Sequence, residues 1–523
     1  MDKRVVLSLV LSAALGVGAT AAQEPGTIEL SLDETLRMAL ENNLELVSAR
    51  YAPAFAEQDV RVQRSNFDAA FEAFYDRSES SNAVTSLATV TGDKQDMLSL
   101  GIQHNLTMGA NYTVGFQTLH QEQTGPQVVA PGAYFSGVAM SLTMPILKGF
   151  GTTVTTETLV LAQQNHEISM TDLEAQAETV IQTVEGAYWD VVAAREALRI
   201  ERLALARAQD LLELNRKKVE VGTLAPIEIT QAEAGVASQE EGVIVAETTL
   251  QDAQDELLRL MAIPDGDPLW ETQIQNSTRP VFDEREVDVD AAIELALANR
   301  AEVAAAEQTL VSRELSQRVA RRQVRHQLDF SANYTPQGSS LDAQALIDPI
   351  TGNLLIPEQN AELEESIARI YNGDLFNWNA RLTYRVPIGN RAAKAQYARA
   401  QLATDQAGVD LLNQEQTVRV EVRRAARGVT SGIKRVEAAR KNVELQQKKL
   451  DAEQKKFENG MSTSFEVLTF QNDLADAELG EIRARLDYIK SVAALERSQG
   501  TLLEARGLRL DVEPASSPDR SQP

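Results

Sequence analysis

Cysteine is absent from the 523 residues of this chain. Disulfide bonds, thiolate metal sites and a lipid-modified N-terminal cysteine are therefore excluded. The chain also lacks a phosphate-binding loop, and no nucleophile, base and orienting group stand at recognisable spacing. We therefore predict a protein that is not an enzyme and holds no cofactor and no metal. Its histidines are scattered without metal-ligand spacing: His104, His120, His166 and His326.

Positive charge is scarce relative to negative charge. Lys and Arg number 50 against 76 for Asp and Glu, which gives a net charge of -26. A chain this acidic has no electrostatic footprint for nucleic acid, so we expect no nucleic-acid partner.

Long apolar runs are also missing, apart from one at the N-terminus. Lys3 and Arg4 precede an apolar run over 5–17, and small residues follow at 19–21. This order predicts a signal peptide over residues 1–21, with a retained membrane anchor as the competing interpretation. No other run is long and apolar enough to cross a membrane as a helix.

Proline is missing from two long windows, 146–225 and 388–513. Within the first window, apolar residues recur at intervals of three, four or seven, which is the spacing of one helix face. We predict a continuous helix over 151–221, which would run roughly 100 Å. A second long helix is predicted over 390–459.

A short phrase occurs twice, as KKVEVG ending at Gly222 and as KKFENG ending at Gly460. Residues 32–45 also match residues 289–302 at a constant offset of 257. Such internal similarity indicates a duplicated structural unit. The predicted first repeat, 22–281, has helices 32–65, strands 66–146, a long helix 151–221, a tip 222–226, a return helix 227–262 and an irregular surface linker 263–287. The predicted second repeat, 288–506, has a helix 289–325, strands 326–387, a long helix 390–459, a tip 460–463 and a return helix 464–502, before a disordered tail 507–523.

Apolar and polar residues alternate in two segments, 327–334 and 377–386. Weaker alternation within 66–146 indicates either two or four further strands. Such strands with aromatic ends are typical of a transmembrane β-barrel, and an ordinary half-buried antiparallel sheet is the alternative. In the barrel interpretation three charged residues face the lumen: Asp329, Arg381 and Arg385.

These features together resemble the TolC-like family of outer membrane efflux channels. The resemblance is carried by the entry segment 32–46, the strand-to-helix junctions 144–151 and 386–389, and the two tips. It implies a mixed fold, all-α plus membrane β-barrel, in which a homotrimer shares a 12-stranded barrel of four strands per subunit and a long periplasmic α-helical barrel. It also implies a periplasmic adaptor, or membrane fusion protein, an inner membrane transporter of the RND, ABC or MFS type, and contact with outer membrane lipid.

The resemblance assigns adaptor docking to a glycine-centred triplet at each tip. Both glycines are in addition predicted to end a helix in a left-handed conformation. The docking triplets are Val221, Gly222 and Thr223 at the first tip, and Asn459, Gly460 and Met461 at the second.

The resemblance further assigns Glu228 and Glu466 to a periplasmic constriction, where six carboxylates of a trimer would favour cations. Ser462 and Thr469 stand where an arginine and a second acid are expected in the family. Helix capping is the alternative for both glutamates, because each falls in the first turn of a predicted helix.

The leading interpretation is a passive outer membrane exit duct of a tripartite efflux or type I secretion system, for drugs, metals, small metabolites or secreted polypeptide. The alternative is a periplasmic coiled-coil structural protein without a pore. That alternative leaves the alternating segments unexplained, so we favour the duct.

Overall fold

The computed structural model describes residues 27–83, 90–125, 128, 130–278, 282–342, 346–347, 350, 354–356, 358–373 and 375–510. The predicted signal peptide, residues 1–21, lies outside these ranges. The chain divides into two compact units, which are treated separately below. The first comprises the described residues up to Val47 with Ala177–Ala292 and Val422–Leu510, and the second comprises Ser48–Gln176 and Ile293–Glu421.

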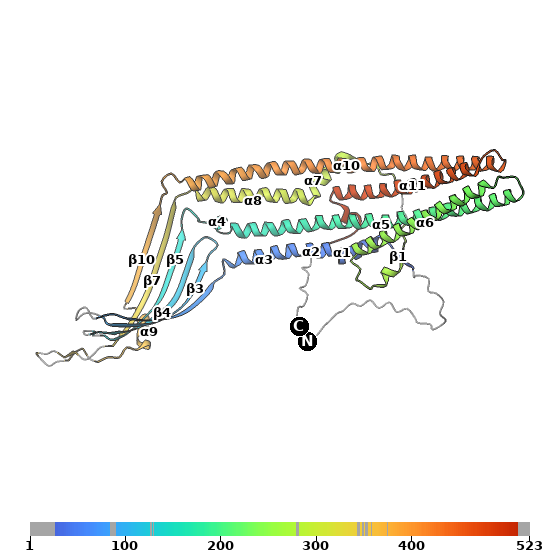
Figure 1. The fold of residues 1–523 in the computed structure, drawn as a ribbon. Helices are drawn as coiled ribbons and strands as arrows, with labels where there is room; N and C mark the ends of the chain where they lie inside the picture. Colours follow the sequence, from blue (N-terminus) through green and yellow to red (C-terminus); the bar gives the residue numbers. More distant parts are fainter. Residues whose placement is uncertain are drawn as a thin grey trace, which may run out of the picture. The chain divides into compact units, whose positions relative to one another are not determined.

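Two helical hairpins carry the tips (Figure 1). The long helices begin and end close to their predicted bounds, although the first starts six residues later because α4 (Thr152–Thr155) is a separate turn. No helix within the described ranges is long and apolar enough to cross a membrane. The hairpins are α5 (Glu157–Glu220) with α6 (Ile227–Leu260), and α10 (Arg391–Glu458) with α11 (Ser464–Ser498).

The core of the first unit surrounds a short parallel sheet. β1 (Thr27–Leu30) pairs with β6 (Gln273–Asn276), and Ile274 of β6 is completely buried. The segment 263–287 was predicted to be an irregular surface linker, and this prediction is wrong at β6 and at the 3-10 helix η1 (Pro268–Glu271). The strand was missed because only four residues form it, too few for a visible alternation.

The C-terminal segment also packs into this core. After the short helix α12 (Leu502–Ala505), Leu508 is buried among core residues. The predicted disordered tail therefore begins too early at 507, since residues 507–510 belong to the packed structure. The remainder, from 511 on, lies outside the described residues.

Two residues interrupt the shorter helices where the sequence alone showed no break. Asn43 separates α1 (Leu32–Asn42) from α2 (Leu44–Ala49), and Arg300 separates α7 (Val289–Asn299) from α8 (Ala301–Gln323). Both residues have extended ψ angles, of 124° and 126°. The predicted single helix 289–325 is therefore two helices. The helix that precedes the sheet is α3 (Tyr51–Ser65).

The second unit is built on a six-stranded antiparallel sheet, with the order β10-β7-β5-β4-β3-β2. The region 66–146 supplies four of these strands. The sheet therefore has two strands more than the four per subunit that the family resemblance implies for the barrel. The strands are β2 (Ala70–Ser81), β3 (Gly92–Asn105), β4 (Asn111–Thr124), β5 (Gly132–Pro145), β7 (Gln327–Leu341) and β10 (Leu375–Arg385), with a separate small pair of β8 (Leu346–Ile347) and β9 (Leu354–Ile356).

The register of the ladders gives the sheet one apolar and one polar face. Partners such as Tyr75 and Leu98, or Phe330 and Leu382, stand directly opposite each other and share a face. The apolar face continues through all six strands, and the alternate positions carry mainly Gln, Asn, Ser, Thr and Gly. The apolar face comprises Phe71, Ala73, Tyr75, Leu98, Leu100, Ile102, Val114, Phe116, Val138, Met140, Leu142, Phe330, Ala332, Tyr334, Trp378, Ala380 and Leu382.

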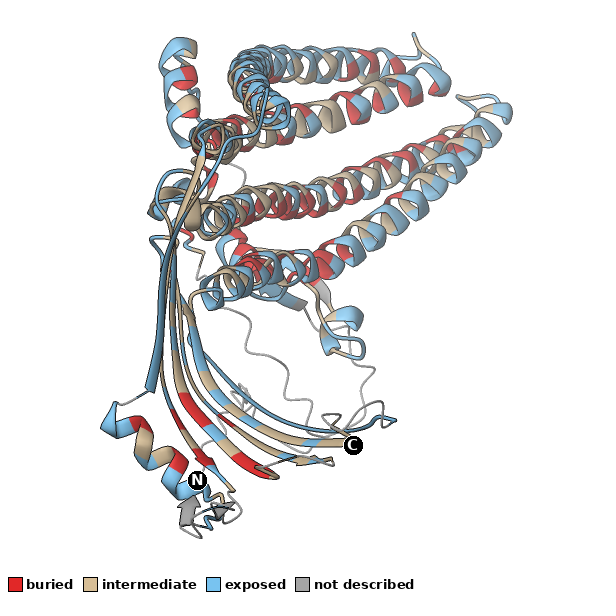
Figure 2. Cartoon of the chain, turned by 90° about the vertical axis from the view of Figure 1, so that its left-hand side faces the viewer, coloured by how far each residue is buried: buried red, intermediate tan, exposed pale blue. Residues whose placement is uncertain are grey.

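Helix α9 (Leu363–Asn372) covers the end of this apolar face that is farthest from the helices. Figure 2 shows it against the convex side of the curved sheet. The buried Ser136 hydroxyl is hydrogen-bonded to the hydroxyls of Thr118, at 2.9 Å, and Ser366 of α9, at 2.5 Å. A Cβ on Gly338 would come within 1.8 Å of the Ser366 carbonyl oxygen, so only glycine lets α9 approach this closely.

Candidate functional site

The two tips have the same backbone geometry. Gly222 and Gly460 both adopt a left-handed φ of 74°. In each turn the residue after the glycine donates its N–H to a carbonyl oxygen five residues earlier, at 2.9 Å. Glycine adopts this conformation without the steric cost of a Cβ. The prediction that both glycines end helices in this way is confirmed.

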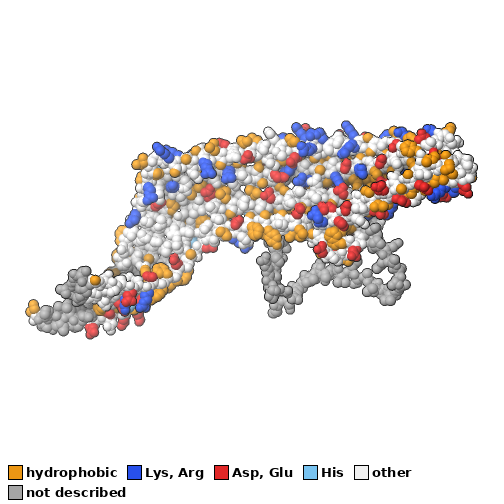
Figure 3. Space-filling view, in the orientation of Figure 1, with side chains coloured by type: hydrophobic (Ala, Val, Ile, Leu, Met, Phe, Trp, Pro, Cys, Tyr) orange, Lys and Arg blue, Asp and Glu red, His pale blue; other side chains and the backbone are white. Residues whose placement is uncertain are grey.

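Large apolar side chains are exposed at both tips. Val221 and Met461 of the two triplets are 71% and 70% exposed, and Ile227 and Phe465 at the start of the return helices are 59% and 64% exposed. Figure 3 shows hydrophobic side chains gathered over this end of α6 and α11. Exposed apolar groups that gather at one place are typical of protein docking surfaces.

Contacts between the hairpins join the two tips. The Glu228 carboxylate of α6 accepts a hydrogen bond from the backbone N–H of Ser464, the first residue of α11, at 3.1 Å. The buried Asn215 amide donates to the Ser464 hydroxyl at 2.7 Å and to the Glu228 carbonyl at 3.2 Å. Lys218 donates to the Phe457 carbonyl at 3.1 Å and lies over its ring. We call these contacts of Asn215, Lys218 and Glu228 the tip contacts.

Glu466 caps its own helix. Its carboxylate accepts from the backbone N–H of Thr463, whose hydroxyl in turn accepts from the N–H of Glu466, so the predicted capping box is present. Glu228, by contrast, caps the helix of the other hairpin. Sequence patterns could not show this, because Ser464 lies 236 residues away.

Glu453 is a buried acid at the second tip that sequence reasoning missed. The Ser462 hydroxyl lies 2.6 Å from the Glu453 carboxylate and 2.7 Å from that of Glu466. A hydroxyl has one hydrogen, so it donates to one of these carboxylates at a time. Hydrogen bonds from Ser462 and Lys456 lower the pKa of Glu453. Glu453 therefore stays ionised, and a serine hydroxyl contacts it at the place where the resemblance to the family leads one to expect an arginine.

The three predicted lumen residues share the polar face of the sheet. Thr383 pairs with Asp329, and the two flanking residues on that face of β10 are Arg381 and Arg385. Asp329 accepts from the Gln327 amide at 2.5 Å, and no ion pair joins it to either arginine in the described structure. These residues carry mixed charge close to the helices.

Three of the histidines pair with tyrosines on the apolar face. His104 contacts Tyr112 and His326 contacts Tyr384 at the end near the helices, with nitrogen-to-oxygen distances of 3.1 and 2.7 Å. His120 stacks on Tyr134 toward the opposite end, with ring centroids 4.2 Å apart. Aromatic side chains thus border the apolar face at both ends of its strands. Among the described residues, no group of three or more metal-ligating side chains is placed to hold a metal ion.

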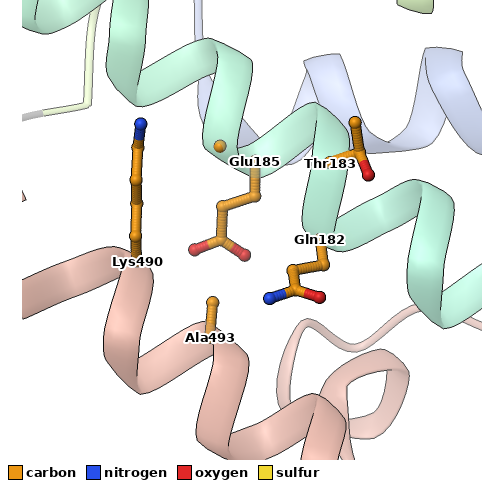
Figure 4. Close-up of a pocket in the computed structure, with 6 residues that line it drawn as sticks. Gln182, Thr183, Glu185, Lys490 and Ala493 are labelled. Carbon is orange, nitrogen blue, oxygen red and sulfur yellow. The ribbon is translucent and has the colours of Figure 1, made fainter. Parts of the chain in front are cut away.

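A small cavity lies between α5 and α11, and the buried Glu185 is among the residues that line it (Figure 4). The cavity has a volume of about 250 Å³ and is lined by Glu185 and Lys490, among others. Glu185, only 2% exposed, receives two hydrogen bonds from Arg506, at 2.9 and 3.0 Å. Burial lowers the pKa of Arg506, but its bonds to Glu185 and its ion pair with Glu496 outweigh that effect and raise the pKa overall. The network is structural, since it ties the C-terminal segment to α5.

A sheet with one apolar face bordered by aromatic residues is typical of an outer membrane β-barrel protein, and in this chain it accompanies two long hairpins that end in matching exposed tips. The model of the outer membrane efflux protein family matches residues 35–262 and 292–501. The chain belongs to this family.

Known proteins agree with this assignment. The pyoverdine export outer membrane protein OpmQ of Pseudomonas putida is 26% identical over 347 residues, which are 65% of each chain. OpmQ of Pseudomonas aeruginosa is 30% identical over 201 residues, 36% of this chain and 41% of the relative. The chain therefore aligns with less than two thirds of either relative.

Two solved structures share the fold. The CmeC outer membrane channel of Campylobacter jejuni has a TM-score of 0.62 at 16% identity, covering 90% of this chain and 86% of CmeC. The outer membrane protein VceC of Vibrio cholerae has a TM-score of 0.63 at 14% identity, covering 90% and 96%.

Proposed function

We propose that the chain is one subunit of a passive outer membrane exit duct. In this duct an inner membrane transporter drives cargo through a periplasmic adaptor that docks on the tips. The observation that carries the proposal is the apolar face of the sheet, continuous through six strands. A periplasmic coiled-coil protein without a pore has no use for such a surface.

The dimensions of the apolar face suit a bilayer. From Tyr112 to His120, which belong to opposite aromatic borders, β4 runs for eight residue steps, or about 27 Å. A strand tilt of about 40° reduces this to about 20 Å, close to the outward apolar band of about 25 Å in membrane barrels. The polar face then lines a water-filled lumen and carries Asp329, Arg381 and Arg385.

The sheet also requires partners, because β2 and β10 are open edges. Unpaired backbone groups cannot face lipid, and the smallest membrane barrels have about eight strands. Six antiparallel strands place β2 and β10 in opposite directions, so the edges of successive copies can form an antiparallel ladder. A homotrimer of six-stranded subunits closes a barrel of 18 strands, which is wider than a barrel of four strands per subunit.

Cysteine cross-linking tests this assembly against the background of a cysteine-free chain. Glu72→Cys on β2, combined in turn with Asn377→Cys, Asn379→Cys or Arg381→Cys on β10, places both thiols on the polar face. We expect one combination to give covalent dimers and trimers on oxidation, because thiols on paired strands meet disulfide geometry. Each single variant is the control. Monomers alone from every combination, on a chain that reaches the outer membrane, would refute the shared barrel.

The two repeats predicted from sequence belong to this proposal. Asn43 and Arg300 interrupt helices at positions separated by the same offset of 257 that relates the matching sequence segments. The glycine turns at Gly222 and Gly460 likewise share one φ value. A duplicated hairpin gives each subunit two equivalent tips, so a trimer offers six docking positions to an adaptor.

The exposed apolar tip residues provide the test of docking. We expect Val221→Asp with Met461→Asp to abolish export while leaving trimers and their membrane insertion intact, because a charge in an apolar interface is costly to desolvate. Cross-linking to the adaptor in cells measures the loss. Lys217→Asp, on the exposed helix surface just before the tip, is the matched control. Normal export by the double variant would show that the adaptor does not dock on these tip residues.

The names of the curated relatives favour a small exported metabolite over a polypeptide as cargo. Both relatives are called pyoverdine export proteins. The mixed charges on the polar face set no strong selectivity of their own, so we propose that the inner membrane transporter selects the cargo.

A further inference from the structure

Four arginines gather where α8 meets the sheet. Arg318, Arg321, Arg322 and Arg325 line a cavity of about 800 Å³, together with Thr153 and Tyr397. Figure 3 shows Lys and Arg side chains over the ends of α8 and α10 beside the strands. In a chain with a net charge of -26, this concentration of positive charge stands out.

Within the part of the chain that the structure describes, no acidic side chain pairs with this cluster. None of the four arginines forms an ion pair within the described residues, and the one hydrogen bond given by their guanidinium groups to protein runs from Arg318 to the Glu314 carbonyl. The start of α10 adds further positive charge through Arg391 and Lys394, and α4 carries no charged residue. One or two arginines here would be explained by the negative end of the α8 dipole. The helix dipole does not account for four arginines around an open cavity.

The cavity lies beside the aromatic border of the apolar face. Arg325 directly precedes His326, whose ring contacts Tyr384 at 2.7 Å. The Asn390 amide donates to the Val324 carbonyl at 2.8 Å and so holds the end of α8 against the start of α10. If the apolar face spans the bilayer as proposed above, this border marks the headgroup level of the periplasmic leaflet.

We propose that this cavity, the arginine pocket, binds the phosphate headgroup of an anionic phospholipid. The guanidinium fork matches phosphate oxygens with paired hydrogen bonds, which a single ammonium cannot do. Basic pockets beside membrane-embedded surfaces bind acidic headgroups by this chemistry. The pocket would fix the depth of the subunit in the membrane at the junction of strand and helix. The proposal rests on the proposed function.

Native mass spectrometry of the purified trimer with phosphatidylglycerol, and separately with phosphatidylethanolamine, tests the site. We expect Arg321→Gln with Arg322→Gln to weaken phosphatidylglycerol binding on the order of tenfold or more, given the contribution of each arginine near an acidic headgroup. Arg313→Gln with Arg399→Gln removes the same charge outside the pocket and should leave binding unchanged.

Three outcomes would overturn the pocket: unchanged lipid binding by the pocket variant, equal loss in the control variant, or displacement of the lipid by excess inorganic phosphate. The last would assign the pocket to free phosphate. The same spectra separate this proposal from the proposed function. If trimers are intact but the parent and the pocket variant bind phosphatidylglycerol equally, only the lipid-binding proposal is refuted. If no trimers are detected, the proposed assembly is refuted.

Discussion

Replacing Glu228 and Asn215 with alanine should open the periplasmic end of the duct and raise its single-channel conductance several-fold. Together these side chains make three hydrogen bonds at the tips, two of which join α11 directly to the first hairpin. Each hydrogen bond contributes about 1 kcal/mol, so each bond lost should shift the balance between joined and separated tips by about fivefold. Planar bilayer recordings on the purified channel measure the change.

Two further variants separate capping from a charged constriction. Glu228→Gln keeps an acceptor for the Ser464 N–H but removes the charge, so the tips should stay joined and any change should appear in cation selectivity. Glu466→Gln keeps the contacts between hairpins and tests the second predicted constriction residue in the same way. If the Asn215 and Glu228 double alanine variant conducts like the parent, the tip contacts do not restrain opening.

The second large effect is expected from Arg506→Met. This change leaves the Glu185 carboxylate buried without its counter-charge, and removing one member of a buried ion pair typically costs about 3–5 kcal/mol. The protein should unfold at a clearly lower temperature or denaturant concentration. Heat-dependent gel mobility and denaturant titration followed by circular dichroism measure the loss.

Arg509→Met is the matched control, because Arg509 is exposed and its side chain forms no ion pair in the described structure. The double variant Glu185→Leu with Arg506→Met should recover part of the stability, since it removes the Glu185 charge as well, while Glu496, the second acidic partner of Arg506, keeps its ion pair with Arg285. Equal stability of Arg506→Met and the parent would show that the C-terminal segment contributes little to the core.

The long hairpins could be predicted because their signals are local. Helical periodicity, proline-free windows and the glycines at 222 and 460 all lie within a few turns of the structure that they specify. Distance along the chain also explains why helix capping was predicted correctly for Glu466 but with the wrong partner for Glu228. The capping box of Glu466 uses Thr463, three residues away, whereas the partner of Glu228 lies in the other hairpin.

The strand number could not be predicted with the same certainty. The first part of β3, Gly92 to Asp96, is polar on both faces, so its alternation is visible only from Met97 onward. Its place in the sheet comes from ladders with β2 and β4, which are contacts between distant residues. The helix break at Arg300 could not be predicted either, because it also depends on a distant residue. The buried Arg300 forms ion pairs with Glu302 and with Glu421, which lies 121 residues away.

The open edges of the sheet have a consequence for biogenesis. Before assembly, β2 and β10 each present a row of unpaired backbone donors and acceptors on a newly exported subunit. Such edges pair readily with any other extended chain, so unassembled subunits are prone to aggregation in the periplasm. If the barrel assembles as proposed, we expect cells to shield its subunits with a holding chaperone, or to keep their concentration low, until the edges are paired.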